Sequence, residues 1–312
     1  MAIAPMCIVA ILAAQSLATQ PTTGPATRPD EGFTPIHLDF DADASLELNA
    51  VQGGGTARYH FYVEGGQRFD MPAMGQSVEP QLSTEQAVSG NTSLKLTTLG
   101  SNGKDRDRVE LRLKHGKGDP NLGREPFRFG QDRWYGLKIF IDPNSAPARP
   151  GGRWVHVHQL WQPHNVETAR LAGWGIPLAV GFKPVAADEA VKFQLAAVAK
   201  SDGRREQFTL GNLEPGRWHE LTFNVMLSHS QDDIDGHFRV WLDGQQTVDA
   251  TVDIGNAPGV DESIGFESLD AMDVRFGLYR KQQAGDQTLY LDDVWFDDHP
   301  PRPMPTSRPA TE

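Results

Sequence analysis

The stretch of sequence that decides the fold is residues 219–227, which read HELTFNVML. Every second side chain is apolar, and this face comprises Leu221, Phe223, Val225 and Leu227. The opposite face comprises Glu220, Thr222, Asn224 and Met226. A repeat of two residues is the side-chain period of a β-strand that buries one face. The stretch therefore predicts a strand with one face in a hydrophobic core.

Several further stretches show the same period. Residues 237–244, HFRVWLDG, alternate in the same way and end in Asp243-Gly244, a dipeptide that favours a tight hairpin turn. The pattern returns in LKIFI at 137–141 and LYLDDVWF at 289–296. Residues 186–199, AADEAVKFQLAAVA, come closest to a helical pattern, but their alternation fits a strand equally well. The chain is therefore predicted to be all-β, a two-sheet antiparallel sandwich with ligand-binding side chains on a concave sheet.

Length and composition are consistent with one such domain. The chain has 312 residues and a net charge of −12, with 31 glycines and 22 prolines. Sandwiches of this size commonly form a single unit, and the negative charge disfavours nucleic acid or an acidic membrane as a partner. We expect a Pro/Thr-rich linker at 19–31, one domain at 32–298 and a Pro-rich tail at 299–312.

Residues 1–18 are predicted to be a secretory signal peptide. They carry no charged side chain, have an apolar centre and end in Ser16-Leu17-Ala18, a small-x-small cleavage pattern. An uncleaved N-terminal anchor is the alternative, although the stretch is short for a membrane span. Cys7 is the only cysteine and lies within it, so a mature chain cleaved at this point would have neither a disulfide nor a cysteine nucleophile. We expect a secreted or periplasmic monomer that has no membrane contact after signal cleavage.

The first of three strands with a polar face lies in residues 104–118, KDRDRVELRLKHGKG. Alternation places Val109, Leu111 and Leu113 toward the core. The other face comprises Arg106, Arg108, Glu110, Arg112 and Lys114. Guanidinium groups bind carboxylates through two parallel hydrogen bonds, so this basic island in an acidic protein suits an anionic ligand. The alternative is a solvated face on which Glu110 neutralises its neighbours.

The second strand is residues 154–162, WVHVHQLWQ. Because Val155 and Val157 favour the core, His156 and His158 are predicted to point away from it. Histidine is the usual acid or base near neutral pH. The His-x-His spacing also occurs in metal sites of cupin-type sandwiches, but Gln and Pro stand at 162 and 163, where such a site adds a glutamate. A metal clamp is therefore disfavoured, and solvated histidines without a role are the other alternative.

The third strand is residues 273–282, DVRFGLYRKQ. Its polar face comprises Arg275, Gly277, Tyr279 and Lys281. A glycine within a strand often marks the close approach of a ligand or of another backbone. A tyrosine hydroxyl can donate a proton, and it can accept one when neighbouring cations stabilise its anion. Taken alone, Tyr279 fits a packing role as well.

Together, the three polar faces suit β-elimination in a uronic-acid polysaccharide. The C5 hydrogen beside the carboxylate is only weakly acidic, so cations or hydrogen-bond donors must stabilise the enolate-like anion that forms when it is removed. A base takes this proton, and an acid protonates the departing glycosidic oxygen. This chemistry requires no cofactor.

The chain resembles the β-jelly-roll, concanavalin-like polysaccharide lyases: alginate lyases, glucuronan lyases and the heparin lyase I type. Arg108-Val-Glu110-Leu-Arg112 matches the Arg-x-Glu-x-Arg strand of alginate lyases. His156-Val-His158 is similar to their Gln-x-His strand, and Gln159-Leu-Trp161 is an alternative register for that motif. Arg275-Phe-Gly-Leu-Tyr279 is similar to Lys-x-Gly-x-Tyr, and the GLYR of residues 277–280 resembles the glucuronan and heparin lyase relatives.

The resemblance implies roles for these residues. Arg108 or His156 would neutralise the substrate carboxylate, while His158 and Tyr279 would share the proton transfers, with Tyr279 as the acid. The expected substrate-binding residues are Arg106, Arg112, Lys114, Trp154, Gln159, Arg239, Trp241, Arg275 and Lys281. Related folds often hold a structural Ca²⁺ near the terminal strands, for which Asp39 and Asp293 are the candidate ligands.

Two other functions remain open at this point. A laminarinase-like glycoside hydrolase needs paired carboxylates of the Glu-x-Asp-x-x-Glu type, and DESIGFES at 261–268 lacks the central aspartate. A non-catalytic carbohydrate-binding module remains an alternative, because a fold alone does not distinguish binding from catalysis. Its tryptophans, notably Trp154 and Trp241, would stack on sugars. The sequence does not identify the uronan, the endo or exo mode, or the base.

Overall fold

The structure is a computed structural model. It describes residues 35–41, 45–49, 56–62, 68–103, 105–113, 130–149, 154–161, 178–185, 193–201, 204–228, 235–252 and 273–301. The chain divides into a unit that ends at Gly32 and a unit from Phe33 to Glu312, and all described residues belong to the second. The predictions for residues 1–18 and 19–31, and for most of the C-terminal tail, lie outside the described residues.

One of the two antiparallel sheets, sheet A, is built around the two stretches quoted first. Its hydrogen-bonded order is β15 (Gln245–Thr251), β14 (His237–Leu242), β13 (Trp218–Met226), β8 (Asp132–Ile141), β17 (Gln287–Asp297), β6 (Ser93–Thr98) and β5 (Gln81–Ser83), with β1 (Ile36–Leu38) also paired to β17. The β14–β15 turn has positive φ at both Asp243 (50°) and Gly244 (79°), as the Asp-Gly dipeptide predicts.

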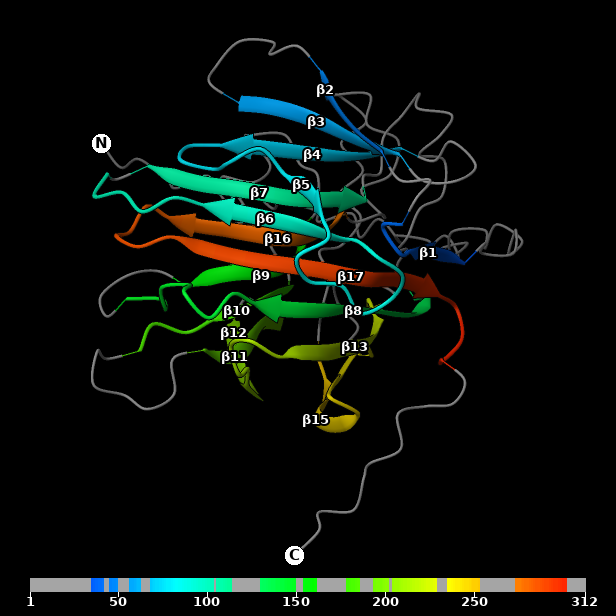
Figure 1. The fold of residues 1–312 in the computed structure, drawn as a ribbon. Coiled ribbons are helices and arrows are strands. Elements are labelled where there is room, and N and C mark those ends of the chain that lie inside the picture. Colours follow the sequence, from blue (N-terminus) through cyan, green and yellow to red (C-terminus); the bar gives the residue numbers. More distant parts are fainter. Residues whose placement is uncertain are drawn as a thin grey trace, which may run out of the picture. The chain divides into compact units, whose positions relative to one another are not determined.

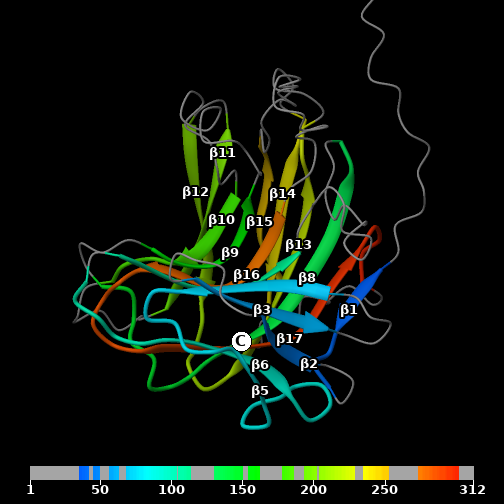
Figure 2. The ribbon, with the colours of Figure 1, turned by 90° about the horizontal axis from the view of Figure 1, so that it is seen from above.

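The other sheet, sheet B, holds the three polar strands side by side. Its order is β12 (Arg204–Asn212), β11 (Gln194–Ser201), β10 (Leu178–Phe182), β9 (Val155–Trp161), β16 (Asp273–Lys281), β7 (Arg106–Leu113), β4 (Arg68–Met74), β3 (Thr56–Tyr62) and β2 (Ser45–Asn49). Figure 1 shows β7, β16 and β9 in succession, and Figure 2 shows the strands from β9 to β12 facing β13 and β14.

The core lies between the two sheets. Sheet A contributes the predicted apolar face of β13, and sheet B contributes the alternate apolar residues of β7 and β16. Residues 194–199 of the ambiguous stretch 186–199 belong to strand β11, so the described part of this stretch contains a strand and no helix. The two-sheet antiparallel sandwich predicted from the sequence is thus confirmed. No helix of the described residues is long and apolar enough to cross a membrane.

Candidate functional site

The polar strands place their chemistry on the outer face of sheet B, the face turned away from sheet A. His156 on β9, Tyr279 on β16 and Arg108 on β7 are Cα partners in one row across the three strands. The rings of His156 and Tyr279 stack with centroids 5.9 Å apart at 22°. The Arg108 guanidinium lies 4.5 Å from the centre of the Tyr279 ring on the other side. We call these three residues the tyrosine row.

A second row crosses the same strands. Gln159 on β9, Arg275 on β16 and Arg112 on β7 are Cα partners, and we call them the glutamine row. Along β7 the two rows are four residues apart, about 13 Å at the usual strand rise. Gln159 is 1% and Arg275 is 2% exposed, although both lie on the outer face. Among the described residues, the side-chain amide of Gln159 has no hydrogen-bond partner for its nitrogen or its oxygen.

Glu110 lies between the two rows on β7, opposite Gly277 of β16. Its carboxylate is 3.1 Å from Nε of Arg108, and the residue is only 2% exposed. Gly277 has a φ of +143°, and a Cβ there would lie 2.3 Å from the carbonyl oxygen of Val109. The glycine is therefore required by the close approach of a neighbouring strand, one of the two causes expected from the sequence.

A β-bulge brings His156 and Gln159 onto the same face. Against β10, His158 pairs with Val180 and His156 with Gly181, so Val157 is the extra residue on β9. Such an insertion turns two consecutive side chains to one side of the sheet. Val157 and His158 both point into the core, with exposures of 2% and 1%. The prediction that His158 faces away from the core is therefore wrong, while His156 and the alternative Gln159 are both on the outer face.

The ring of His158 is enclosed by aromatic side chains and held at both nitrogens. Nε2 is 2.9 Å from the hydroxyl of Tyr135, and Nδ1 is 3.0 Å from the carbonyl oxygen of Arg275. The ring stacks on Phe276 at 4.8 Å and packs against Phe223 at 5.0 Å. Burial lowers the pKa of His158 to about 3, because the charged ring would lose its hydration. His158 thus cannot exchange protons with a substrate on the outer face.

Arg280, the arginine of the GLYR motif, lies on the opposite face of β16 from Tyr279. Arg280 points inward with 0% side-chain exposure, and its Nε lies 3.2 Å from the carboxylate of Asp107, which is also fully buried. Its other nitrogens donate to the carbonyl oxygens of Leu99 and Gly285 and to the side chain of Gln287. This residue therefore serves the interior of the sandwich and not the outer face of sheet B.

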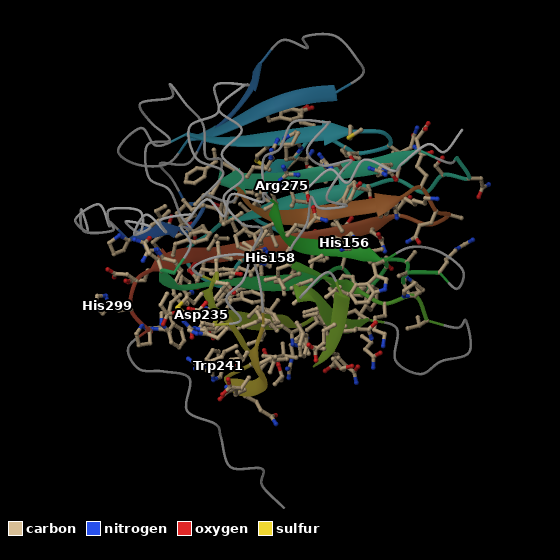
Figure 3. The ribbon with its side chains drawn as sticks, turned by 180° about the vertical axis from the view of Figure 1, so that it is seen from behind. His156, His158, Asp235, Trp241, Arg275 and His299 are labelled. Carbon is tan, nitrogen blue, oxygen red and sulfur yellow. The ribbon has the colours of Figure 1, made fainter. Side chains whose placement is uncertain are left out.

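The predicted residues Arg239 and Trp241 lie on β14 of sheet A, not on sheet B. Their neighbours Val240 and Leu242 are in the core, so both point to the outer face of sheet A. Arg239 pairs with Asp249, and Trp241 contacts Trp134 with ring centroids 5.3 Å apart. Figure 3 shows Trp241 apart from His156 and Arg275. The prediction that these two residues share the site is therefore wrong, because alternation on β14 sends them to the opposite side of the sandwich.

The remaining predicted residues border the tyrosine row or fall outside the description. The guanidinium of Arg106 lies 5.9 Å from the centre of the Tyr279 ring, and Lys281 is the Cα partner of Arg106. The Trp154 ring is 6.3 Å from that of His156. Lys114 lies outside the described residues. Among the described residues, the outer face of sheet B therefore combines three cations in or beside the tyrosine row, those of Arg106, Arg108 and Lys281, with the buried carboxylate of Glu110.

The candidate calcium ligand Asp293 has basic neighbours. Its carboxylate is 2.6 Å from Nζ of Lys138 and 3.7 Å from Nε2 of His37, and these groups hold its pKa below the usual range. The carboxylate of Asp39 accepts a hydrogen bond from the backbone of Asp41. An ammonium beside Asp293 does not fit a Ca²⁺ ligand, since the ion would have to displace it. Calcium at this position remains a prediction from the sequence.

The arrangement of the site suits proton transfer beside an anion. An imidazole and a phenol lie within one row, where each can donate or accept a proton, and guanidinium groups on both rows can bind carboxylates. The bulge is the feature that alternation alone misses. Its sequence signal is the spacing of the apolar residues on β9, which is two from Val155 to Val157 and three from Val157 to Leu160.

Comparisons with known proteins give a family and similar folds. The family model described as "Polysaccharide lyase" matches residues 56–295, which is more than half of the chain. The solved endo-beta-1,4-glucuronan lyase from the fungus Trichoderma reesei is similar in structure, with a TM-score of 0.51 and 14% identity, covering 76% of this chain and 92% of that chain. Alginate lyase AlyC3 has a TM-score of 0.46 and 11% identity, covering 82% and 89%. No curated protein matches the sequence.

Proposed function

The chain belongs to the polysaccharide lyase family, and we propose that it cleaves a uronic-acid-containing acidic polysaccharide by β-elimination. The observation that carries this proposal is the tyrosine row, in which the Tyr279 ring lies between the His156 ring and the Arg108 guanidinium. An acid, a base and a cation on one outer strand face are the groups that this elimination needs.

Each residue of the row receives one role. The Arg108 guanidinium binds the carboxylate at C5 and stabilises the enolate-like anion that forms on it. The His156 ring takes the C5 proton, since it is the imidazole of β9 that lies on the outer face. The electron pair of the C–H bond forms the C4–C5 double bond, and the C4–O bond breaks. Tyr279 then protonates the departing oxygen, so the products are an unsaturated uronate and a new sugar end.

The glutamine row supports a polymer in which neighbouring sugars carry carboxylates. Arg112 and its cross-strand partner Arg275 place guanidinium groups four residues along β7 from Arg108. The buried amide of Gln159 has no hydrogen-bond partner among the described residues, so a ligand that bonds to it would satisfy a donor and an acceptor that are otherwise unpaired. The fungal protein with a similar fold is a glucuronan lyase. Polyglucuronate is therefore the first substrate to test, followed by alginate.

Several further features of the protein belong to this proposal. A polysaccharide substrate is met outside the cytoplasm. We therefore expect the protein to be secreted or periplasmic after cleavage at residue 18. The chemistry uses side chains alone, without a cofactor. We expect a monomer that binds neither nucleic acid nor membranes.

The primary test is a uronan panel of polyglucuronate, alginate, ulvan and heparin, assayed with and without a chelator. Ultraviolet absorbance of the unsaturated uronate reports cleavage, and we expect it with at least one unsulfated uronan. Release of reducing ends without this absorbance would indicate hydrolysis and contradict the proposal. Binding to a uronan without any cleavage would indicate a carbohydrate-binding module.

Substitution of the acid tests the assignment within the row. Tyr279→Phe removes one hydroxyl, and we expect kcat to fall about 10²- to 10⁴-fold while binding of the polymer persists. Tyr290→Phe is the matched control, because Tyr290 lies on sheet A, where its hydroxyl donates to Glu85. Equal losses in the two variants would remove Tyr279 from the proposed mechanism.

A further inference from the structure

His158 connects three strands that belong to both sheets. From β9 its ring reaches the Tyr135 hydroxyl on β8 of sheet A and the backbone carbonyl of Arg275 on β16 of sheet B. Two of its neighbours belong to the glutamine row. Gln159 is the next residue in the chain, and Arg275 is the residue whose carbonyl the ring contacts. The buried ring is thus next to the backbone of two residues whose side chains point to the outer face, and Figure 3 labels His158 and one of them, Arg275.

The partners of the ring fix its protonation state. A carbonyl oxygen can only accept, so Nδ1 of His158 carries the hydrogen and donates it to Arg275. In a neutral ring Nε2 then has a lone pair, which accepts from the hydroxyl of Tyr135 at 2.9 Å. The low pKa of the buried ring agrees with a neutral Nδ1–H tautomer at neutral pH.

The position of the ring coincides with the irregular part of the sheet. The ladder between β9 and β16 loses its register between the pairs His158–Phe276 and His156–Tyr279. A bulge disrupts backbone hydrogen bonds locally, and His158 places a side-chain donor on the carbonyl of Arg275, one residue from the Phe276 end of this shift. Without the bulge, side chains three apart, such as those of His156 and Gln159, would point to opposite faces.

We propose that His158 is a positioning residue, which holds the bulge of β9 so that the tyrosine row and the glutamine row share one face. It acts through the backbone of Arg275 and through Tyr135, and it does not touch the substrate. The inference rests on the proposed lyase function, which it deepens by assigning a task to the second histidine of the motif. A displacement of about 1 Å in such a constellation can cost 10²-fold in rate.

Two substitutions separate positioning from catalysis. His158→Leu keeps apolar packing but has no donor for the Arg275 carbonyl, and we expect kcat/KM on the cleaved uronan to fall about 100-fold. His158→Asn places an amide N–H near the position of Nδ1, and we expect it to recover at least ten-fold of that loss with the pH profile of the wild type. If Asn is as inactive as Leu and one limb of the pH profile disappears, His158 is a proton-transfer group and the proposal fails.

A control variant and a spectroscopic readout complete the test. Tyr135→Phe removes only the partner of Nε2, so we expect a smaller loss of kcat/KM than in His158→Leu. In the wild-type protein, ¹⁵N NMR of the ring should show the neutral Nδ1–H tautomer down to about pH 5. The Nε2–H tautomer, or titration near 6.5, overturns the proposal even when no uronan is cleaved. Absence of cleavage with the expected tautomer contradicts the lyase function alone.

Discussion

At the scale of the residue, the two histidines of β9 differ because one inserted residue separates their environments. His156 is in the tyrosine row beside Trp154, whereas His158 is enclosed by Phe223, Phe276 and Tyr135. Burial disfavours the imidazolium form of His158, and neutral partners satisfy both nitrogens. The same residue type therefore serves chemistry at one position and the interior at the other.

The pH dependence of stability should report the buried histidine. The pKa of His158 is about 3 when folded and about 6.5 when unfolded, so the unfolded chain binds an additional proton between these values. The contribution of the neutral His158 ring to the free energy of unfolding is complete above about pH 6.5 and is lost as the pH falls toward 3. At pH 5 the loss is about 2 kcal/mol relative to neutral pH.

Urea unfolding of the wild type and His158→Leu at several pH values isolates this contribution, because the other titrating groups cancel in the difference. The stability advantage of the wild type over the variant should shrink by about 2 kcal/mol between pH 7.5 and pH 5. An advantage that stays constant over this range would show that the ring does not remain neutral in the fold.

At the scale of the element, alternation predicted most strands but not the bulge. The apolar faces of β7, β13, β14 and β16 follow from their sequences, because a period of two fixes which side chains meet the core. For β9 the valines indicated the inward face correctly up to Val157, and the bulge then reversed the pattern. The pairing of β7, β16 and β9 required the structure, since residues 108, 156 and 279 are distant in the sequence.

Gly277 should be intolerant of a side chain for two separable reasons. Its φ of +143° is unfavourable for other residues, and a Cβ would lie 2.8 Å from Cα of Glu110. We expect Gly277→Ala to lower the unfolding free energy by about 2 kcal/mol or more. Gly216→Ala is the matched control, because its φ is +84° but the nearest atom to its Cβ, in Pro143, is 3.3 Å away. Equal losses in urea unfolding would mean that strand contact at Gly277 contributes nothing.

At the scale of the whole molecule, Arg280 joins the two sheets. It extends from β16 of sheet B to Gln287 on β17 of sheet A, and it neutralises the buried Asp107. Removal of one partner leaves an uncompensated charge in the interior, so Arg280→Met should cost about 3–5 kcal/mol. The double variant Arg280→Met/Asp107→Leu should be more stable than Arg280→Met alone, because no buried charge remains.

The exposed pair of Arg239 and Asp249 is the control for this buried pair. Arg239→Met should change the unfolding free energy by less than about 1 kcal/mol, since surface pairs are screened by water. Denaturant unfolding measures all three variants. A double variant less stable than Arg280→Met would indicate that hydrogen bonds of Asp107, such as that from the backbone of Gln76, matter more than its charge.

The location of Arg239 and Trp241 also bears on where the polymer binds: on the outer face of sheet B alone, or on the outer face of sheet A as well. Because these residues lie on sheet A, Arg239→Gln should leave KM for the uronan unchanged, whereas Arg108→Gln should lower kcat/KM about 100-fold. Initial rates over a range of polymer concentrations measure both. A large rise in KM for Arg239→Gln would show that the polymer also binds the outer face of sheet A.

The inserted residue in β9 has a consequence for comparing this chain with other lyases. Aligned letter by letter, a Gln-x-His motif assigns the functional imidazole to whichever histidine has the right count, which here selects the buried His158 or displaces it by Trp161. Aligned by cross-strand partner, the imidazole beside Tyr279 is His156. In this chain the functional imidazole is thus better assigned through cross-strand partners than through its count along β9, because the assignment then moves two residues, from His158 to His156.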